Sequence, residues 1–552
     1  MSNGGSRSAT DPRGTGTGSG TGPVYGRRDV LGLGALGGAV LALGPLLSAC
    51  ESGAATAART PTRGGLLRIA GAGVQSETKN VFNTNSPQEI TRNRHLFDWL
   101  GYMEGGRPVP YIVEAIEPAA DVSRWRLKIR KEARFSDGAP VTAEDVLFSL
   151  HSASDPKIGG GLLSAAAASI DFKASRTVGT DVVELRLTDP LADMDTQLYA
   201  GKVYVIKKDS RLTAPESFTV DRVVGSGPYT LTDLKVGQSA KLTLNKDYWG
   251  GALLGGGPYL GEIEVFNIPD PTARLNALIG GQADLAAKLD YAGTKVNASN
   301  SAFSFAKTDR VYANEGCFIM NARQKPFDDP RVRLAFKLAC DRRALVQGAL
   351  LGFGSPANDL QGVGFPDYHG DELPQRAHDP AQAEALLRQA GVTGETVEIS
   401  VFPGVGTAAA AQIYAEQLGK VGMKTRVREI TPPELFKNFP TFSNIQVLAV
   451  AVPGNQPFAT SVAPRSLVSK STFNVSGWLK PDWDRRLLRA RATTDPAERK
   501  DLMLGLQKEF WDDSGWIVWG YQTIVNGTAS SVRGVRLDGV EDAPSVRRAW
   551  KA

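Results

Sequence analysis

The sequence predicts a protein built from several α/β or α+β domains, and three observations predict this. The chain has 552 residues, more than one hydrophobic core supports, and roughly two to four domains are expected. Segments that alternate apolar and polar residues, as strands do, lie between segments with helix caps and helical apolar spacing. No repeat of about 20 to 50 residues is visible, which excludes solenoids and propellers.

Strict alternation of apolar and polar residues predicts three strands. The segment Trp-Arg-Leu-Lys-Ile-Arg at 125–130 places apolar side chains on one face and cationic side chains on the other. The segments 183–187 and 262–266 alternate in the same way, with glutamates among their polar residues. Each strand is expected to pack one face on a core and to expose the other.

Aspartate–proline pairs mark the beginnings of four helices. The aspartate caps free backbone N–H groups of the first turn, and proline suits the first helical position because it has no N–H to satisfy. These pairs are Asp270-Pro271, Asp329-Pro330, Asp379-Pro380 and Asp495-Pro496. Thr142, with Asp145 three residues later, forms a capping box that predicts a fifth helix.

The first 49 residues are expected to be an export signal. Arg27 and Arg28 precede a Gly-rich apolar stretch, 31–47, which leads into Leu-Ser-Ala-Cys at 47–50. This order resembles a twin-arginine export signal joined to a lipoprotein box, in which the thiol of Cys50 receives the lipid. A membrane-spanning helix is disfavoured, because the 17-residue stretch is short and is diluted by glycines.

Lipidation would hold the protein on the extracytoplasmic face of the cell membrane through a flexible tether, residues 50–63. A disulfide can form in that compartment. Cys317 in an expected strand and Cys340 near an expected helix end are, however, the kind of cysteine that is usually buried as a thiol. The sequence leaves open whether Cys317 and Cys340 form a disulfide or remain free thiols.

Composition argues against nucleic acid, metal and cofactor as partners. There are 63 Lys and Arg against 58 Asp and Glu, a net charge of +5, and no run of five or more cationic residues occurs. Four histidines and three cysteines are too scattered for the spacing of a zinc site. No metal and no other cofactor is therefore expected.

No motif of a catalytic mechanism is present in the sequence. It lacks a Gly-x-Ser-x-Gly elbow, a Walker loop and a Ser-x-x-Lys signature with its partner motifs. The histidines also leave few candidate general bases. A binding protein is predicted rather than an enzyme.

Several segments, in chain order, carry a resemblance to a known family. The most diagnostic is 133–146, Ala-Arg-Phe-Ser-Asp-Gly-Ala-Pro-Val-Thr-Ala-Glu-Asp-Val. The other matching segments are 64–70, 125–130, 225–229, 326–335, 341–343 and 379–391. With them the chain resembles the large extracytoplasmic solute-binding proteins of ABC importers, the peptide/nickel-type family 5.

The resemblance implies an α/β, two-lobed type II periplasmic-binding-protein fold with an extra inserted domain. Projected onto this chain, lobe one comprises 64–98, 202–312 and 522–552. The inserted domain of lobe one is 99–201, and lobe two is 313–521. The chain would cross between the lobes near 313–321 and 520–526, and a solute would bind in the cleft between them.

The resemblance also implies the function. The chain is expected to be the lipid-anchored substrate-binding component of an ABC importer that captures a small solute or a peptide and delivers it to the permease and ATPase. It is expected to be a monomer. The alternative is a lipoprotein of the same fold that senses a ligand or tethers a partner without transport.

The family alignment suggests cleft residues but no ammonium anchor. Candidate ligand-binding residues are Asn83, Thr84, Asn85, Ser86, Phe436, Val450, Ala451, Val452, Trp478, Trp519 and Tyr521. Peptide-binding relatives use an aspartate of lobe two for the peptide's α-ammonium, and Pro453 occupies that position here. No acidic residue occurs between Glu434 and Asp482. A more apolar cleft is expected, for which modified peptides, sugars and siderophores are alternatives to ordinary peptides.

Overall fold

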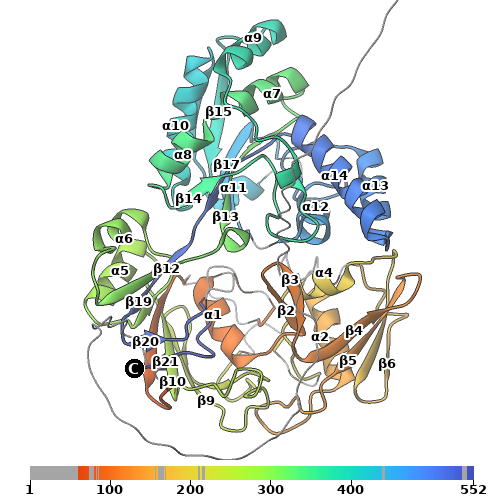
Figure 1. The fold of residues 1–552 in the computed structure, drawn as a ribbon, viewed down its shortest axis with the longest axis vertical. Helices are drawn as coiled ribbons and strands as arrows, with labels where there is room; N and C mark the ends of the chain where they lie inside the picture. The colour runs from red at the N-terminus through yellow and green to blue at the C-terminus, as the bar shows by residue number, and fades with distance from the viewer. Residues whose placement is uncertain are drawn as a thin grey trace, which may run out of the picture. The chain divides into compact units, whose positions relative to one another are not determined.

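The computed structural model describes residues 60–73, 80–82, 84, 86–155, 157–158, 167, 169–208, 210, 212–213, 218–437, 442–454, 456–536 and 544–552. Residues 59–552 form one compact unit (Figure 1). The expected export signal, Cys50 and residues 51–59 of the expected tether lie outside the described residues.

A seven-stranded mixed sheet organises the first part of this unit. In spatial order its strands are β12 (Phe303–Lys307), β19 (Val525–Ala529), β11 (Leu285–Ala286), β1 (Leu66–Gly71), β10 (Glu262–Asn267), β9 (Ser239–Leu244) and β8 (Tyr229–Lys235). The central strand β1 pairs in parallel with β10 and β11. Its Leu67 and Ile69 side chains are fully buried, which explains the apolar sequence of the first strand.

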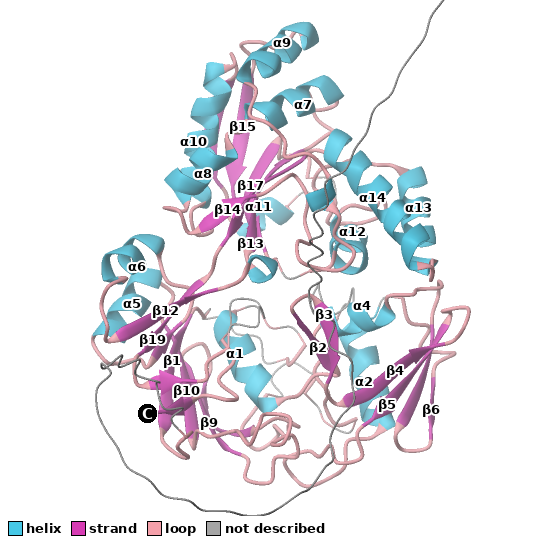
Figure 2. Ribbon diagram, viewed as in Figure 1, coloured by secondary structure: helices cyan, strands magenta, loops and turns pink. Residues whose placement is uncertain are grey.

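Two helices contact this sheet, and a third packs on one of them. They are α1 (Pro87–Leu96), α5 (Pro271–Ile279) and α6 (Tyr291–Asn297) (Figure 2). Helix α1 contacts β1, β8, β9 and β10, whereas α5 contacts β1, β11 and β19. The turn between β11 and α6 lies beside the end of the sheet at which β19 begins, because the Leu289 amide donates to the Val525 carbonyl at 2.8 Å.

A six-stranded sheet organises the second part. Its strands are β14 (Gly354–Pro356), β18 (Trp516–Gln522), β13 (Asn314–Met320), β17 (Val447–Val452), β15 (Thr396–Val401) and β16 (Lys424–Glu429). The helices packed on this sheet or on one another are α7 (Pro330–Ala339), α8 (Arg342–Ala349), α9 (Pro380–Ala390), α10 (Thr407–Lys420), α13 (Pro481–Ala492) and α14 (Pro496–Asp513). All seven residues of β18 are buried, as expected for a strand covered on both faces.

A separate four-stranded antiparallel sheet lies within residues 99–201. Its strands are β4 (Val113–Pro118), β5 (Arg124–Ile129), β7 (Val182–Arg186) and β6 (Arg176–Val178), and α2 (Ala143–Ser154) contacts β6 and β7. Strand β5 buries Trp125, Leu127 and Ile129 and exposes its cationic residues, which confirms the alternation predicted at 125–130. The strands expected at 183–187 and 262–266 are β7 and β10.

A hairpin and several short elements complete the chain. The hairpin is β2 (Gly101–Glu104) with β3 (Arg107–Pro110), and it contacts α4 (Met194–Ala200). The remaining elements are η1 (Arg310–Tyr312), η2 (Gly370–Glu372), α11 (Pro432–Phe436), the π-helix η3 (Phe458–Val462), α12 (Ala463–Ser466), and the pair β20 (Val532–Arg533) and β21 (Trp550–Lys551).

The predicted helix caps are present. The aspartates before α5, α7, α9 and α14 each accept a hydrogen bond from a backbone N–H of the first helical turn. Thr142 and Asp145 form both hydrogen bonds of the capping box at the start of α2. Gly391 ends α9 in the left-handed region, with φ 73°, where glycine carries no steric penalty. All five predicted helix starts are confirmed.

The chain passes twice between the seven-stranded and six-stranded sheets. One crossing runs from the end of β12 at Lys307 to the start of β13 at Asn314, ahead of the predicted 313–321, because most of that segment is strand β13 of the six-stranded sheet. The other runs from Gln522 in β18 to Val525 in β19, within the predicted 520–526. That these crossings act as a hinge stays a prediction.

Cys317 in β13 and Cys340, which ends α7, are both buried free thiols and form no disulfide.

Candidate functional site

A cavity of about 520 Å³ lies where the two large sheets face each other across the crossings. Its lining residues are Thr84, Ser86, Pro87, Ile90, Lys288, Leu289, Tyr291, Asn314, Pro403, Gly404, Val405, Ala451, Pro453, Arg465, Gln522, Thr523, Ile524 and Val525. The first seven belong to segments around the seven-stranded sheet, and those from 403 to 465 belong to segments around the six-stranded sheet. The cavity is thus walled by both parts of the fold and floored by the second crossing.

Lys288 is held in the cavity wall by an unusual backbone conformation. It is one of six non-glycine residues with positive φ among the described residues, with φ 52°. The buried Arg274 guanidinium donates to the carbonyl oxygens of Ala287 and Lys288 at 2.7 and 2.6 Å, and the Asn526 side chain accepts from the Lys288 N–H at 2.7 Å. Since such a conformation costs free energy and occurs where surrounding contacts enforce it, these hydrogen bonds hold the backbone from which the lysine side chain extends.

Arg465 provides a second cation, from the six-stranded side of the cavity. It lies on α12, directly after the π-helix η3, a type of helix found mostly as short pieces and frequently at functional sites. Its Nη1 donates to Gln456 Oε1 at 3.5 Å, and its guanidinium lies 5.7 Å from the centre of the Phe473 ring. Ser471 donates to its carbonyl oxygen.

Gln522 brings a buried amide to the floor of the cavity. The residue is 3% exposed, and its Nε2 has no hydrogen-bond partner among the described residues. An amide donor buried without a partner costs roughly 1–3 kcal/mol. A ligand oxygen would satisfy this donor. Asn314, its neighbour across the β13–β18 pair, also lines the cavity.

The charge of the lining is positive. Lys288 and Arg465 are its charged side chains, and no Asp or Glu is among the lining residues that the structure describes. Three acids adjoin lining residues in the sequence. The buried Glu89 accepts from the hydroxyl of the lining Ser86 at 3.0 Å. Asp290 Oδ1 accepts from the Gly293 N–H at 2.6 Å and caps α6, while its Oδ2 has no partner among the described residues. Glu315 accepts from Gln361 Nε2 at 2.7 Å and from the Gly362 N–H at 3.1 Å. Burial raises the pKa of Glu315 to about 8.

The structure brings three of the residues predicted from sequence to this cavity, namely Thr84, Ser86 and Ala451. Val450 and Val452 lie on β17 on either side of Ala451; they are half-buried and pack against the cluster that contains Cys317. Asn83, Asn85 and the side chain of Phe436 lie outside what the structure describes.

Besides Phe436, three aromatic residues were predicted, and none of these three is among the cavity-lining residues. Trp478 is 3% exposed, and its Nε1 donates to Asp513 Oδ2 at 2.9 Å. Trp519 packs on Phe318 with ring centres 6.2 Å apart. The Tyr521 hydroxyl lies 3.2 Å from that of Tyr368.

Sequence reasoning missed Lys288, Arg465 and Gln522. One signal was available for Arg465, because it belongs to the long segment without acidic residues that precedes Asp482. Gln522 adjoins Tyr521 in the expected crossing, but alternation along a fully buried strand does not single it out. Nothing in the local sequence marks Lys288, whose position depends on Arg274 and Asn526.

Two general features of the described residues bear on function. Nowhere in the described ranges do three or more His, Cys, Asp or Glu side chains gather in a way that could hold a metal ion. Among the described helices, none combines the length and the apolar character needed to cross a membrane.

Comparisons with known proteins identify similar chains. A family model described as bacterial extracellular solute-binding proteins, family 5, matches residues 107–461. The glutathione-binding protein GsiB of Pectobacterium atrosepticum is 24% identical over 470 residues, which are 82% of this chain and 88% of that protein.

Two solved structures resemble the fold of this chain. The ABC transporter substrate-binding protein CtaP of Listeria monocytogenes has a TM-score of 0.76 at 18% identity, covering 89% of this chain and all of that one. The binding protein AgaA of A. tumefaciens R10, solved with agropinic acid, has a TM-score of 0.73 at 20% identity, covering 88% and 99%.

Proposed function

Because the chain belongs to family 5 of the bacterial extracellular solute-binding proteins, we propose that it is the substrate-binding component of an ABC importer and binds its solute in the cavity at the crossings. The observation that carries this proposal is the cavity of about 520 Å³, to which both large sheets contribute residues. Its volume lies within the range of roughly 300–1,000 Å³ that is usual for small-molecule sites.

The family also confirms the predicted fold. The chain has the two-lobed α/β fold of type II periplasmic binding proteins. Members of the family bind substrates rather than transform them. On this fold a solute that contacts both lobes stabilises their closed arrangement, because the closed state has the higher affinity. The lobe boundaries proposed are those given above, with the crossings 307–314 and 522–525 as the hinge.

The solute proposed is a peptide-like or other small molecule that carries at least one carboxylate. Lys288 and Arg465 reach the cavity from different sides, and the buried Gln522 amide offers a further donor. A carboxylate can accept charge-assisted hydrogen bonds from the two cations and a further hydrogen bond from the amide. The similar glutathione-binding protein supports this choice, since glutathione is a tripeptide with two carboxylates.

A free α-ammonium is not required of this solute. Pro453 lines the cavity at the position where peptide-binding relatives are expected to carry their aspartate. An ammonium buried here would face Lys288 and Arg465 without a lining carboxylate to offset the cost of desolvation. The favoured solutes are therefore acidic non-peptide solutes and acidic peptides whose amino group is blocked, distant or, as in glutathione, next to a carboxylate of the same residue.

Thermal denaturation of the purified full-length protein tests solute binding. Glutathione and pooled tri- to pentapeptides are added in turn, since a ligand at a hundred times its dissociation constant stabilises the fold by about 2.7 kcal/mol. Wild type is expected to melt at a higher temperature with at least one addition, and Ala451→Trp, which fills the cavity, is expected to show no shift. Ala408→Trp, on the exposed face of α10, is the control. A shift that survives Ala451→Trp would overturn the choice of cavity, and the absence of any shift would overturn the choice of solute.

A matched pair of ligands tests the carboxylate. Calorimetric titration with glutathione and with its diethyl ester is expected to give at least tenfold tighter binding of the acid. Lys288→Met and Arg465→Met are each expected to reduce this preference, whereas Lys295→Met, an exposed lysine of α6, is expected to leave it unchanged. Equal affinity for acid and ester would exclude the acidic solute while leaving the binding function intact.

The anchor and the transport role need separate experiments. The proposed lipid on Cys50 predicts an acylated N-terminal peptide in mass spectrometry of the membrane fraction, and Cys50→Ala is expected to release the protein from membranes. Uptake of the labelled ligand by whole cells is expected to stop when either this chain or its permease is deleted. Uptake that persists without this chain would favour a sensing lipoprotein.

A further inference from the structure

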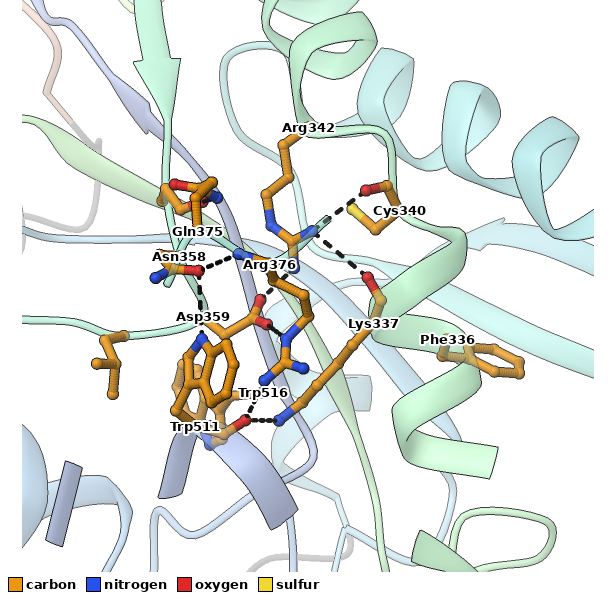
Figure 3. A network of polar contacts seen from close by, with 12 residues as sticks. Phe336, Lys337, Cys340, Arg342, Asn358, Asp359, Gln375, Arg376, Trp511 and Trp516 are labelled. Carbon is orange, nitrogen blue, oxygen red and sulfur yellow. Dashed lines mark hydrogen bonds and ion pairs between the residues drawn. The ribbon is translucent and has the colours of Figure 1, made fainter. Parts of the chain in front are cut away.

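Three buried cationic side chains lie around one buried carboxylate, and two of them contact it directly (Figure 3). Arg342 Nη2 and Arg376 Nε contact opposite oxygens of Asp359, at 2.5 and 2.7 Å. Lys337 Nζ donates to the Trp511 carbonyl oxygen at 2.6 Å. One carboxylate balances one cation, so this cluster carries surplus positive charge in the interior.

The pKa values of the cluster reflect that surplus. Burial, assisted by the nearby arginines Arg376, Arg333 and Arg342, lowers the pKa of Lys337 to about 7. Although burial opposes it, the Arg342 and Arg376 guanidinium groups hold the pKa of Asp359 below its usual range. The cluster therefore favours additional negative charge in its neighbourhood.

A cavity of about 550 Å³ opens onto this cluster, apart from the one described above. It is lined by Cys340, Asp341, Arg342, Arg343, Pro356, Gln375, Arg376, Ala377 and His378. Three of these residues are arginines, and Arg343 is exposed. The single lining acid is occupied, because Asp341 Oδ1 accepts from the Ala344 N–H at 3.0 Å and its Oδ2 lies 3.8 Å from His378 Nδ1.

Arg342 brings a buried donor without a partner to this cavity. Its Nη1 donates to the carbonyl oxygens of Lys337 and Cys340 at 3.4 and 3.2 Å, but its Nε has no partner among the described residues. In Figure 3, Gln375 lies on the side of this guanidinium opposite to Cys340, and both Gln375 and Arg342 line the cavity. The Arg342 side chain is 4% exposed. A charged donor this deeply buried is costly to leave without an acceptor.

We propose that this cavity is a second binding site, for a small oxyanion of the phosphate or sulfate type. The oxyanion would accept hydrogen bonds from Arg342 Nε and from the guanidinium of Arg343, and would offset the surplus charge of the cluster. The cavity is larger than a single phosphate, so the oxyanion can be free or part of a larger molecule. The proposal is independent of the solute in the other cavity, because the two sets of lining residues have no member in common.

Calorimetric titration with inorganic phosphate, at constant ionic strength set with chloride, tests the site in the full-length protein. Wild type is expected to bind one phosphate saturably, and Arg343→Glu is expected to weaken binding at least tenfold. Arg485→Glu, at an arginine 71% exposed on α13, is the control for net charge and is expected to bind as wild type does. Melting temperatures without phosphate establish that each variant is folded.

The other outcomes are also decisive. Phosphate binding that is lost in Lys288→Met but kept in Arg343→Glu would place the ion in the first cavity and overturn the proposal, as would the absence of saturable binding. Titration with glycerol 3-phosphate separates the two sources of the oxyanion. Tighter binding than that of phosphate would indicate a phosphate ester as the natural ligand, and equal binding would indicate the free ion.

Discussion

The carboxylate of Asp193 lies 2.5 Å from Nη2 of Arg499, a residue 306 positions later in the chain. Asp193 precedes α4, within the proposed inserted domain, and Arg499 lies on α14 of the proposed lobe two. Arg491 Nη2 contacts the other oxygen of Asp193 at 3.4 Å, and the Ala192 N–H donates to the Arg491 carbonyl oxygen at 2.8 Å. These contacts join the proposed inserted domain to the proposed lobe two, and none of the residues involved lines the solute cavity.

Replacing Asp193 is therefore expected to weaken solute binding without removing any cavity residue. Asp193→Asn leaves two arginines without their carboxylate when the lobes close, whereas water can solvate them when the lobes are open. We expect affinity for glutathione to fall about tenfold in calorimetry, which corresponds to ~1.4 kcal/mol. The exposed Asp189→Asn serves as the control. If Asp193→Asn lowers the melting temperature but leaves the affinity for glutathione unchanged, these contacts would lie within one rigid body and would not depend on closure of the lobes.

A glycine two residues after β17 allows two segments beside the cavity to meet. A Cβ atom on Gly454 would collide with the carbonyl oxygen of Ala313, at the first crossing. Gly454→Ala is expected to lower the free energy of unfolding by about 1–3 kcal/mol in urea titration. Gly419→Ala on α10, where a Cβ meets no neighbouring atom, is expected to stabilise the protein slightly. Equal effects of the two substitutions would contradict the close approach.

Asp359 is expected to be essential for the stability of the six-stranded part. Asp359→Asn fits the same left-handed backbone, φ 59°, but leaves Arg342 and Arg376 buried without a carboxylate. A loss of about 3–5 kcal/mol in the free energy of unfolding is expected by chemical denaturation. Asp482→Asn, at an exposed ion pair on α13, is expected to cost less than about 1 kcal/mol. A loss of that small size at Asp359 would mean that the cluster tolerates further positive charge.

Glu315 is expected to make stability depend on pH in a direction unusual for a carboxylate. Its pKa is raised by burial to about 8 in the folded protein, against 4.5 ordinarily, so between these values the folded state holds a proton that the unfolded state releases. The stabilisation is complete below pH 4.5 and is lost as the pH rises through 8. Glu315→Gln is neutral throughout, and its amide can pair with Gln361, whose Oε1 has no partner among the described residues.

The difference between wild type and Glu315→Gln isolates this residue. The free energy of unfolding of wild type, relative to the variant, is expected to fall steadily from pH 5 to pH 8 in urea titrations. A difference independent of pH would show that Glu315 is ionised in the folded protein.

Features that depend on neighbouring residues in sequence were predicted well. The Asp-Pro pairs cap α5, α7, α9 and α14 because a cap and its helix are adjacent in the chain. The alternation of apolar and polar residues predicted β5, because the residues of a strand themselves determine which face it buries. The family resemblance supplied Thr84, Ser86 and Ala451.

The remainder of the cavity depends on contacts between distant segments. Lys288 is directed by Arg274 and Asn526, which lie 14 residues before it and 238 residues after it. Trp519 packs on Phe318, a partner about 200 residues earlier, and no local pattern distinguishes such a core tryptophan from one in a cleft. The family alignment marked Trp478, Trp519 and Tyr521 as candidates, but tertiary packing determines their exposure.

The central claim is that one solute is held from both sides of the cavity at the crossings, and hydrogen–deuterium exchange of the full-length protein with and without glutathione tests it most directly. Slower exchange is expected in 84–90 and 288–291, around the seven-stranded sheet, together with 403–405 and 451–465, around the six-stranded sheet. Slower exchange on one side alone, or in segments away from this cavity, would contradict a site shared by the two lobes.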